Sequence, residues 1–251
     1  MPYQFTVSPD FSAKALPSWF LFNTWLQRAL GEDIHLEIFN EFSAQRAAIA
    51  DGKIDLIYAN PYDATALIRR EGFRAVAAPR GRFDEALIAV RADSPVERVE
   101  DFRPGLTIAT TGDLDVLSMC MILIEPADLH AGNVELVQCE SFIRVAKTLM
   151  QGQADAGFFL ETTFSELSNL VRSVLRPLIR SRISTIRHAL LIGPRFSHRV
   201  TDLQQALLGM ATSERGPGVL EGLGFENWEI LEQEDVEFMI DLMDTLEVKT
   251  V

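Results

Sequence analysis

The 251-residue sequence has only two cysteines, Cys120 and Cys139, and four histidines. The two thiols could form a disulfide only if the fold brought their Cα atoms within about 7 Å, and we predict that both are buried and free. No zinc-ligand spacing surrounds either cysteine. No two histidines stand four residues apart, as they do in a helical zinc site. The sequence therefore predicts neither a bound metal nor another cofactor.

The chain also lacks an excess of basic residues and a long apolar run. It has 23 Lys and Arg against 36 Asp and Glu, which gives a formal net charge of −13. Nucleic acid and anionic membranes both need a positive field, so neither is an expected partner. No apolar run reaches the roughly 18 residues that a membrane span requires. We expect no membrane insertion.

No signal peptide is visible at the start of the chain. Residues 1–7 (MPYQFTV) alternate as a strand does, without a basic start or an apolar signal core. The protein is therefore expected in the periplasm if an export signal has been removed, and in the cytoplasm if Met1 is the native start.

One short pattern occurs twice and organises the chain. A helix-like run ends at Gly52, residues 54–59 follow as a short buried strand, and residues 60–62 turn into a further helix. Residues 149–157 repeat this order of helix end, Gly152, spacer, Asp and strand. Strand, tight turn and helix present backbone N–H groups to a ligand in α/β proteins. We therefore predict two similar lobes, each with its own strand-end loop.

The whole chain alternates between strand and helix patterns, which predicts an α/β fold with mostly parallel sheets covered on both faces. We expect two Rossmann-like α/β lobes joined by hinge strands. The first lobe is predicted to comprise residues 1–88 and 190–251, and the second residues 89–189. Residues 86–90 and 187–192 are the predicted hinge strands.

Three local features accompany this assignment. Ser43 is expected to cap a helix that runs to Gly52, and residues 163–171 are expected to form one helix. The glycine-rich stretch at residues 216–225 is interpreted as a loop between two C-terminal helices. It is not a dinucleotide fingerprint, because no strand precedes it.

Four strand-end turns carry the candidate ligand-binding residues. Helix N-termini have free N–H groups and a partial positive charge, so they favour anionic groups. Alternatively, these polar residues only cap their own helices. The candidates are Ser8, Asp10, Phe11, Tyr58, Asn60, Tyr62, Thr110, Thr111, Gly112, Asp113, Glu161 and Thr162.

Four of these residues are predicted to form a ligand clamp shared between the lobes. The Tyr58 ring would cover the ligand, Thr110 and Thr111 would bind it beside a helix N-terminus, and Glu161 would accept a cationic or hydroxyl group. Replacing Thr111 or Glu161 by Ala should then weaken binding by ~1–3 kcal/mol. Helix capping by the threonines and a solvated Glu161 form the alternative.

The order of Gly52, Asp55, Tyr58, Pro61 and Tyr62 resembles that in substrate-binding proteins of phosphonate-type (phosphate, phosphite or phosphonate) ABC transporters. The strand ending in Thr-Thr-Gly at residues 110–112 and the run Gly-Gln-Ala-Asp-Ala-Gly at residues 152–157 add to this resemblance. It covers nearly the whole chain and implies a type 2 periplasmic-binding fold.

The resemblance also implies roles for particular residues. The family holds phosphonate oxygens on a Ser-Thr-Ser-like turn, which matches Thr110, Thr111 and Gly112. Its aromatic residue after the third strand matches Tyr58, and its acidic group for a ligand amine matches Glu161. Asp113 departs from the pattern, because a carboxylate there would repel a dianion. A zwitterionic, cationic or neutral polar ligand is therefore as compatible with the sequence as a simple oxyanion.

We predict a solute-binding protein that closes its two-lobed cleft on a small polar, zwitterionic or oxyanionic ligand. Its partner would be an ABC permease in uptake or a sensor kinase in ligand sensing. The alternative is a cytoplasmic enzyme on the same fold, similar to menaquinone- or thiamine-pathway enzymes. No histidine stands at a predicted cleft turn, which disfavours the enzyme, but acid–base catalysis by Asp10, Asp113 or Glu161 stays open.

Overall fold

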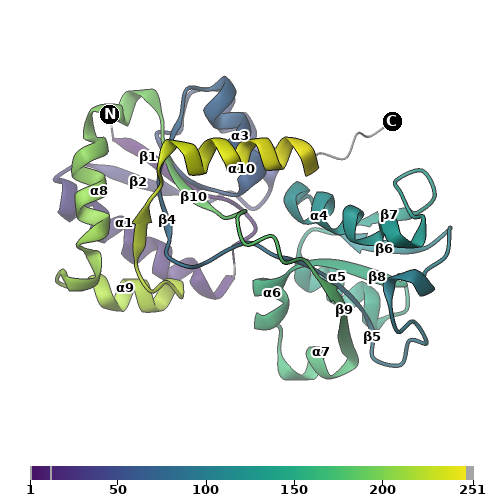
Figure 1. Cartoon of the computed structure of the whole chain (residues 1–251). Coiled ribbons are helices and arrows are strands. Elements are labelled where there is room, and N and C mark those ends of the chain that lie inside the picture. The colour runs from purple at the N-terminus through teal and green to yellow at the C-terminus, as the bar shows by residue number, and fades with distance from the viewer. Residues whose placement is uncertain (1, 12, 247–251) are drawn as a thin grey trace. The chain divides into compact units, whose positions relative to one another are not determined.

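The computed structural model describes residues 2–11 and 13–246, and the chain divides into two compact units (Figure 1). Unit 1 comprises the residues up to Phe83 and the segment Arg187–Asp241. Unit 2 comprises Asp84–Ile186 and the C-terminal end of the last helix from Leu242. The chain thus leaves unit 1 after Phe83 and returns to it at Arg187, where the sequence predicts lobe boundaries after residues 88 and 189.

Unit 1 is built from a six-stranded sheet and the helices that cover it. Its strands are β1 (Tyr3–Val7), β2 (Ile34–Glu37), β3 (Leu56–Ala59), β4 (Arg74–Pro79), β10 (Ala189–Ile192) and β11 (Trp228–Ile230). Its helices are α1 (Leu16–Leu30), α2 (Phe42–Ala50), α3 (Pro61–Arg70), α8 (Val200–Leu208), α9 (Gly216–Leu223) and α10 (Gln233–Leu246) up to Asp241.

The strand order in unit 1 is β11-β4-β10-β3-β1-β2. β1 pairs in parallel with β2 and β3, whereas β10 lies antiparallel between β3 and β4. The first four strands of the chain therefore run in one direction, as predicted, and the returning strand β10 is inserted among them. Connections between parallel strands pass through helices, which places helices on both faces of the sheet.

Alternate residues of β3 belong to different halves of the core. Leu56 and Tyr58 pack in an aromatic cluster with residues of α1, α8 and α9. Ile57 and Ala59 pack on the opposite face with residues of α2, α3 and α10. This period of two is expected of a strand, and burial on both faces explains why residues 54–59 form an almost continuous apolar run.

Unit 2 repeats this plan with a five-stranded sheet. Its strands are β5 (Ala86–Arg91), β6 (Thr107–Thr110), β7 (Glu135–Gln138), β8 (Ala156–Leu160) and β9 (Leu175–Arg180). Its helices are α4 (Leu114–Ile124), α5 (Phe142–Met150), α6 (Glu161–Glu166) and α7 (Asn169–Val174). The order β7-β6-β8-β5-β9 corresponds to β2-β1-β3-β10-β4 in unit 1, and β5 is the inserted antiparallel strand. The predicted α/β fold with two similar lobes is confirmed.

The repeated Gly-x-x-Asp pattern makes the same hydrogen bonds in both units. Gly52 and Gly152 have left-handed φ angles of 68° and 67°, which glycine tolerates best. The Asp55 carboxylate accepts from Gln4 N (2.8 Å), and the Asp155 carboxylate accepts from Thr107 N (3.0 Å). Each aspartate therefore fastens the start of its strand to the neighbouring strand. Asp55 additionally forms an ion pair with Arg195.

Several local predictions are wrong at their boundaries. The helix before Gly52 begins at Phe42 after Glu41, so Ser43 lies within its first turn. The predicted helix over residues 163–171 is two short helices, α6 and α7, and Ser168 caps the second. The glycine-rich stretch is not a loop, because α9 occupies residues 216–223 and β11 follows it. Buried Val219, Leu220 and Leu223 form the apolar face of α9.

Candidate ligand-binding site

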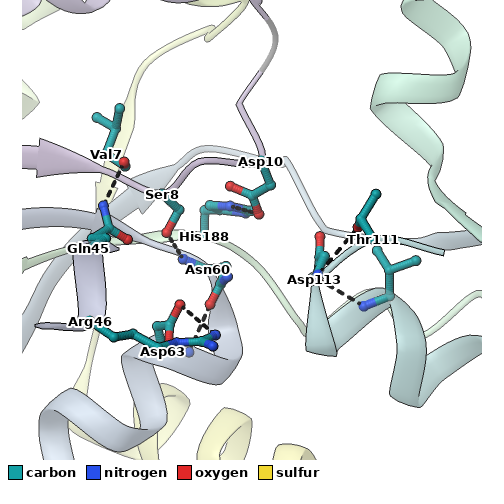
Figure 2. A network of polar contacts seen from close by, with 11 residues as sticks. Val7, Ser8, Asp10, Gln45, Arg46, Asn60, Asp63, Thr111, Asp113 and His188 are labelled. Carbon is teal, nitrogen blue, oxygen red and sulfur yellow. Dashed lines mark hydrogen bonds and ion pairs between the residues drawn. The ribbon is translucent and has the colours of Figure 1, made fainter. Parts of the chain in front are cut away.

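In unit 1, the turns after β1 and β3 are joined by hydrogen bonds (Figure 2). Ser8 N donates to Tyr58 O (2.9 Å), and Asn60 N donates to Ser8 Oγ (3.0 Å). Asn60 is the N-cap of α3, where its Oδ1 accepts from Asp63 N (2.8 Å). Both Ser8 and Asn60 are 1% exposed. The two neighbouring parallel strands thus bring residues 52 positions apart into one buried polar cluster.

Gln45 and Arg46 of α2 support these turns from neighbouring positions. Gln45 is fully buried, and its Nε2 donates to Val7 O (2.8 Å) at the end of β1. The Arg46 guanidinium donates to both carboxylate oxygens of Asp63, at 2.6 and 3.2 Å. Burial raises the pKa of the Asp63 carboxyl above its ordinary value, and the Arg46 charge opposes this shift. Asp63 therefore holds Arg46 beside the first turn of α3.

Asp10 lies against a histidine that sequence reasoning missed. His188 Nε2 and Asp10 Oδ2 are 3.0 Å apart, and their side chains are 11% and 2% exposed. The His188 ring stacks on Tyr58, with the ring centroids 5.2 Å apart. The expectation that no histidine stands at a predicted cleft turn is wrong, because His188, directly before β10, contacts the turn at Asp10, 178 residues earlier in the chain. No local sequence signal connects Asp10 to His188.

The aromatic candidates of unit 1 lie against its hydrophobic core and against Arg46. Tyr58 is 7% exposed and packs against Trp19 as well as His188. Phe11 packs against the same aromatic core. The Tyr62 ring lies 5.5 Å from the Arg46 guanidinium carbon. These contacts anchor the turns.

In unit 2, the Thr-Thr-Gly-Asp turn connects β6 to α4. Thr110 ends β6 and is fully buried, and Thr111 is 5% exposed. Thr111 Oγ1 accepts from Asp113 N (3.3 Å), and Asp113 Oδ1 accepts from Val116 N (3.1 Å; Figure 2). Asp113 is therefore the N-cap of α4. Its carboxylate accepts a hydrogen bond from its own helix. This contact agrees with the alternative that Asp113 is a helix cap.

Glu161 begins α6 immediately after β8, and its carboxylate forms an ion pair with Arg180 at the end of β9. Its backbone N–H donates to Glu85 O (2.7 Å). Thr162 follows in the same helical turn, and Gly112 is exposed in the turn before α4. Glu161 already has a cationic partner within unit 2, and Arg180 is a cation that sequence reasoning missed.

Three buried polar atoms at these turns have no hydrogen-bond partner among residues 2–11 and 13–246. They are Asn60 Nδ2, Asp10 Oδ1 and Thr110 Oγ1. An unpaired buried polar atom costs about 1–3 kcal/mol, so each one calls for an explanation, such as a bound ligand, ion or water. Asn60 Nδ2 is a donor, Asp10 Oδ1 is an acceptor and Thr110 Oγ1 can be either. Unit 1 therefore has one buried donor and one buried acceptor without a partner, and unit 2 has one buried hydroxyl without a partner.

The described part of the chain contains no cluster of three or more His, Cys, Asp or Glu side chains arranged to hold a metal ion. Both cysteines are free, as predicted; Cys120 is buried, but Cys139 is only partly so. None of the described helices combines the length and apolarity needed to cross a membrane.

Comparison with protein families gives a match over almost the whole chain. The family described as "ABC transporter, phosphonate, periplasmic substrate-binding protein" matches residues 5–236. No curated protein sequence matches the chain.

Solved structures share the fold at low sequence identity. PhnD1 from Prochlorococcus marinus (MIT 9301), in complex with methylphosphonate, has a TM-score of 0.83 and 12% identity, with 97% of each chain covered. A binding protein component of the ABC phosphonate transporter from Pseudomonas aeruginosa (PA3383) has a TM-score of 0.74 and 13% identity, covering 100% of this chain and 90% of its own. The aliphatic sulphonate binding protein SsuA from Escherichia coli has a TM-score of 0.68 and 14% identity, covering 97% and 87%.

Proposed function

Because the chain belongs to the family of periplasmic phosphonate substrate-binding proteins of ABC transporters, we propose that it captures a small organic oxyanion for its permease. The family consists of transport proteins, so the enzyme alternative loses its support. Nothing in the comparisons favours a sensor kinase as the partner. The ligand and the residues that bind it are our proposal, argued below from the strand-end turns.

The observation that carries the proposal is the unpaired Asn60 Nδ2 at the N-terminus of α3. This donor is 1% exposed and lies beside a helix end that favours negative charge. In unit 2, Thr110 Oγ1 lies before the N-terminus of α4 and can also donate. We propose that Asn60 and Thr110 donate to oxygens of an oxyanion. PhnD1 was solved with methylphosphonate, which has such oxygens.

The acceptor Asp10 Oδ1 adds a second requirement. It is buried beside His188 and has no donor among the described residues. A ligand amine or hydroxyl would supply that donor, and a carboxylate binds a charged amine more strongly than a neutral group. We therefore propose an amino- or hydroxyalkyl phosphonate or sulfonate in preference to the simple alkyl compound. Tyr58 would act indirectly, by holding the His188 ring.

The charge beside α4 favours a monoanion. Asp113 and Asp115 are 1% and 2% exposed and lie at the start of this helix. A carboxylate at either position opposes a dianion more than a monoanion. A sulfonate has a single acidic proton and is a monoanion throughout the ordinary pH range, whereas a phosphonate has a second ionisation that makes it a dianion as pH rises. We expect binding of a phosphonate to strengthen as pH falls through its second ionisation, and binding of a sulfonate to stay constant.

Calorimetric titration with a matched panel tests this function. The panel contains methylphosphonate, an aminoalkyl phosphonate, the corresponding sulfonates and inorganic phosphate, each at two pH values. We expect the amino compounds to bind more tightly than their alkyl counterparts, and Asp10→Asn to remove that difference. No heat with any oxyanion would refute the proposed ligand class. Equal binding of amino and alkyl compounds would refute the role of Asp10.

A further inference from the structure

Unit 1 has a concave site among helices that lie outside the strand-end turns. A groove of about 810 Å³ lies between the C-terminal half of α1, the end of α8 and the start of α9. The three helices pack together in the structure, and α1 contacts both others (Figure 1). The volume is within the range of sites that hold small organic molecules.

The wall of the groove is mainly apolar and held in place. Leu21, Ala206 and Val219 contribute aliphatic surface. The Trp25 ring lines the groove, and its Nε1 donates to Ser213 Oγ (2.9 Å), which ties α1 to the segment before α9. Gly218 also lines it, and a Cβ added there would have no atom within 4 Å. The missing side chain at Gly218 therefore keeps the space open.

The polar groups at the groove are mostly donors. Arg28 and Arg215 line it and are exposed, and no carboxylate of residues 2–11 and 13–246 pairs with Arg28. Arg215 has only a 3.7 Å contact with the highly exposed Glu214, which is a weak surface pair. The Gln205 amide adds another donor. Glu214 also lines the groove, so its lining carries two arginines and one carboxylate.

We propose that this groove binds an organic anion with an extended apolar body, such as a medium-chain alkyl or aryl carboxylate. The apolar part would lie along Trp25 and Val219, where its burial is favourable. The carboxylate would meet the Arg28 guanidinium, which binds carboxylates in a two-pronged geometry. This inference does not depend on the oxyanion site at the strand-end turns, because it uses none of its residues.

The test uses decanoate below its micelle concentration, with binding followed by calorimetry. Gly218→Leu adds a side chain to the lining of the groove at a position where a Cβ meets no atom within 4 Å, and leucine is a better helix former than glycine. We expect this variant to bind decanoate roughly tenfold or more weakly at an equal or higher melting temperature. Arg28→Ala should weaken binding by about two- to fivefold, whereas Arg70→Ala on α3 is a matched control that should change nothing.

Other outcomes overturn the proposal. Undetectable decanoate binding to the wild-type protein, or equal binding by wild type and Gly218→Leu, would refute the groove as the site. If 1-decanol bound as tightly as decanoate, the carboxylate and Arg28 would have no role. Titration of Gly218→Leu with the phosphonate and sulfonate panel distinguishes the groove from the oxyanion site. That variant should bind the oxyanions as the wild type does.

Discussion

The role proposed for Asn60 can be separated from its structural role by one substitution. Asn60 Oδ1 caps α3 by accepting from Asp63 N (2.8 Å), whereas Asn60 Nδ2 is buried without a partner among the described residues. Serine is also a good N-cap but lacks the second donor. Asn60→Ser should therefore keep the helix and lose the proposed contact to the ligand.

The expected magnitudes follow from the contacts. A hydrogen bond to a charged group contributes about 1.5–3 kcal/mol, so Asn60→Ser should weaken binding of the oxyanion about 10- to 150-fold. The same change removes a buried unpaired donor, which costs about 1–3 kcal/mol in the free protein. Its free energy of unfolding should therefore be equal to or higher than that of the wild type. Calorimetric titration and urea unfolding measure the two effects.

Two further variants at this position provide controls. Asn60→Ala removes the cap, so it should lower the free energy of unfolding by about 0.5–2 kcal/mol. Asn60→Asp keeps the cap but replaces the donor with a charged acceptor, so it should weaken oxyanion binding more than Asn60→Ser. If Asn60→Ser binds the oxyanion with wild-type affinity, Asn60 acts only as a helix cap.

Three other predictions concern stability and thiol chemistry. Asp55→Asn should lower the free energy of unfolding by ~1–3 kcal/mol, and Asp155→Asn by less than about 1 kcal/mol. The reason for the difference is that Asp55 is 3% exposed and ion-paired, whereas Asp155 is exposed. Equal losses in urea unfolding would contradict this prediction. Burial raises the pKa of the Cys120 thiol well above its ordinary value. An aromatic disulfide reagent at pH 8 should therefore modify Cys139 and leave Cys120 unreacted in the folded protein. Comparable reaction rates of the two cysteines would be inconsistent with this prediction. Burial also raises the pKa of Asp63 above 3.8, so its contribution to stability is largest below pH 3.8 and is lost as pH rises through the folded pKa. The stability of wild type relative to Asp63→Asn should fall over that window, and a rise would show that the ion pair of Asp63 dominates.

Local sequence patterns determined much of the fold. Gly52 and Gly152 end helices with left-handed backbones, and each precedes a short apolar strand. These features depend on the conformational freedom of glycine and on periods of two and 3.6 residues, which a single chain segment displays by itself. The two-lobed α/β plan could therefore be predicted, as could the strand-end turns with Ser8, Asn60 and Thr110.

Local patterns failed where tertiary packing overrode propensity. The segment 216–225 has glycines that predict a loop, yet it contains α9, because Val219, Leu220 and Leu223 bury their side chains in the core of unit 1. Burial of an apolar face stabilises a helix more than propensity disfavours it.

The candidate site depended still more on long-range contacts. The sequence identified Asp10 and Glu161 as candidate ligand-binding carboxylates, but it did not show that the fold gives them His188 and Arg180 as partners. It also could not show whether Asp113 faces a ligand or caps α4, because both roles need the same residue beside a helix N-terminus. The sequence by itself determined which residue types stand at the strand ends. Only the tertiary structure decided which of their polar atoms are hydrogen-bonded and which, as in Asn60, Asp10 and Thr110, have no partner among the described residues, because hydrogen bonds form between groups that are close in space.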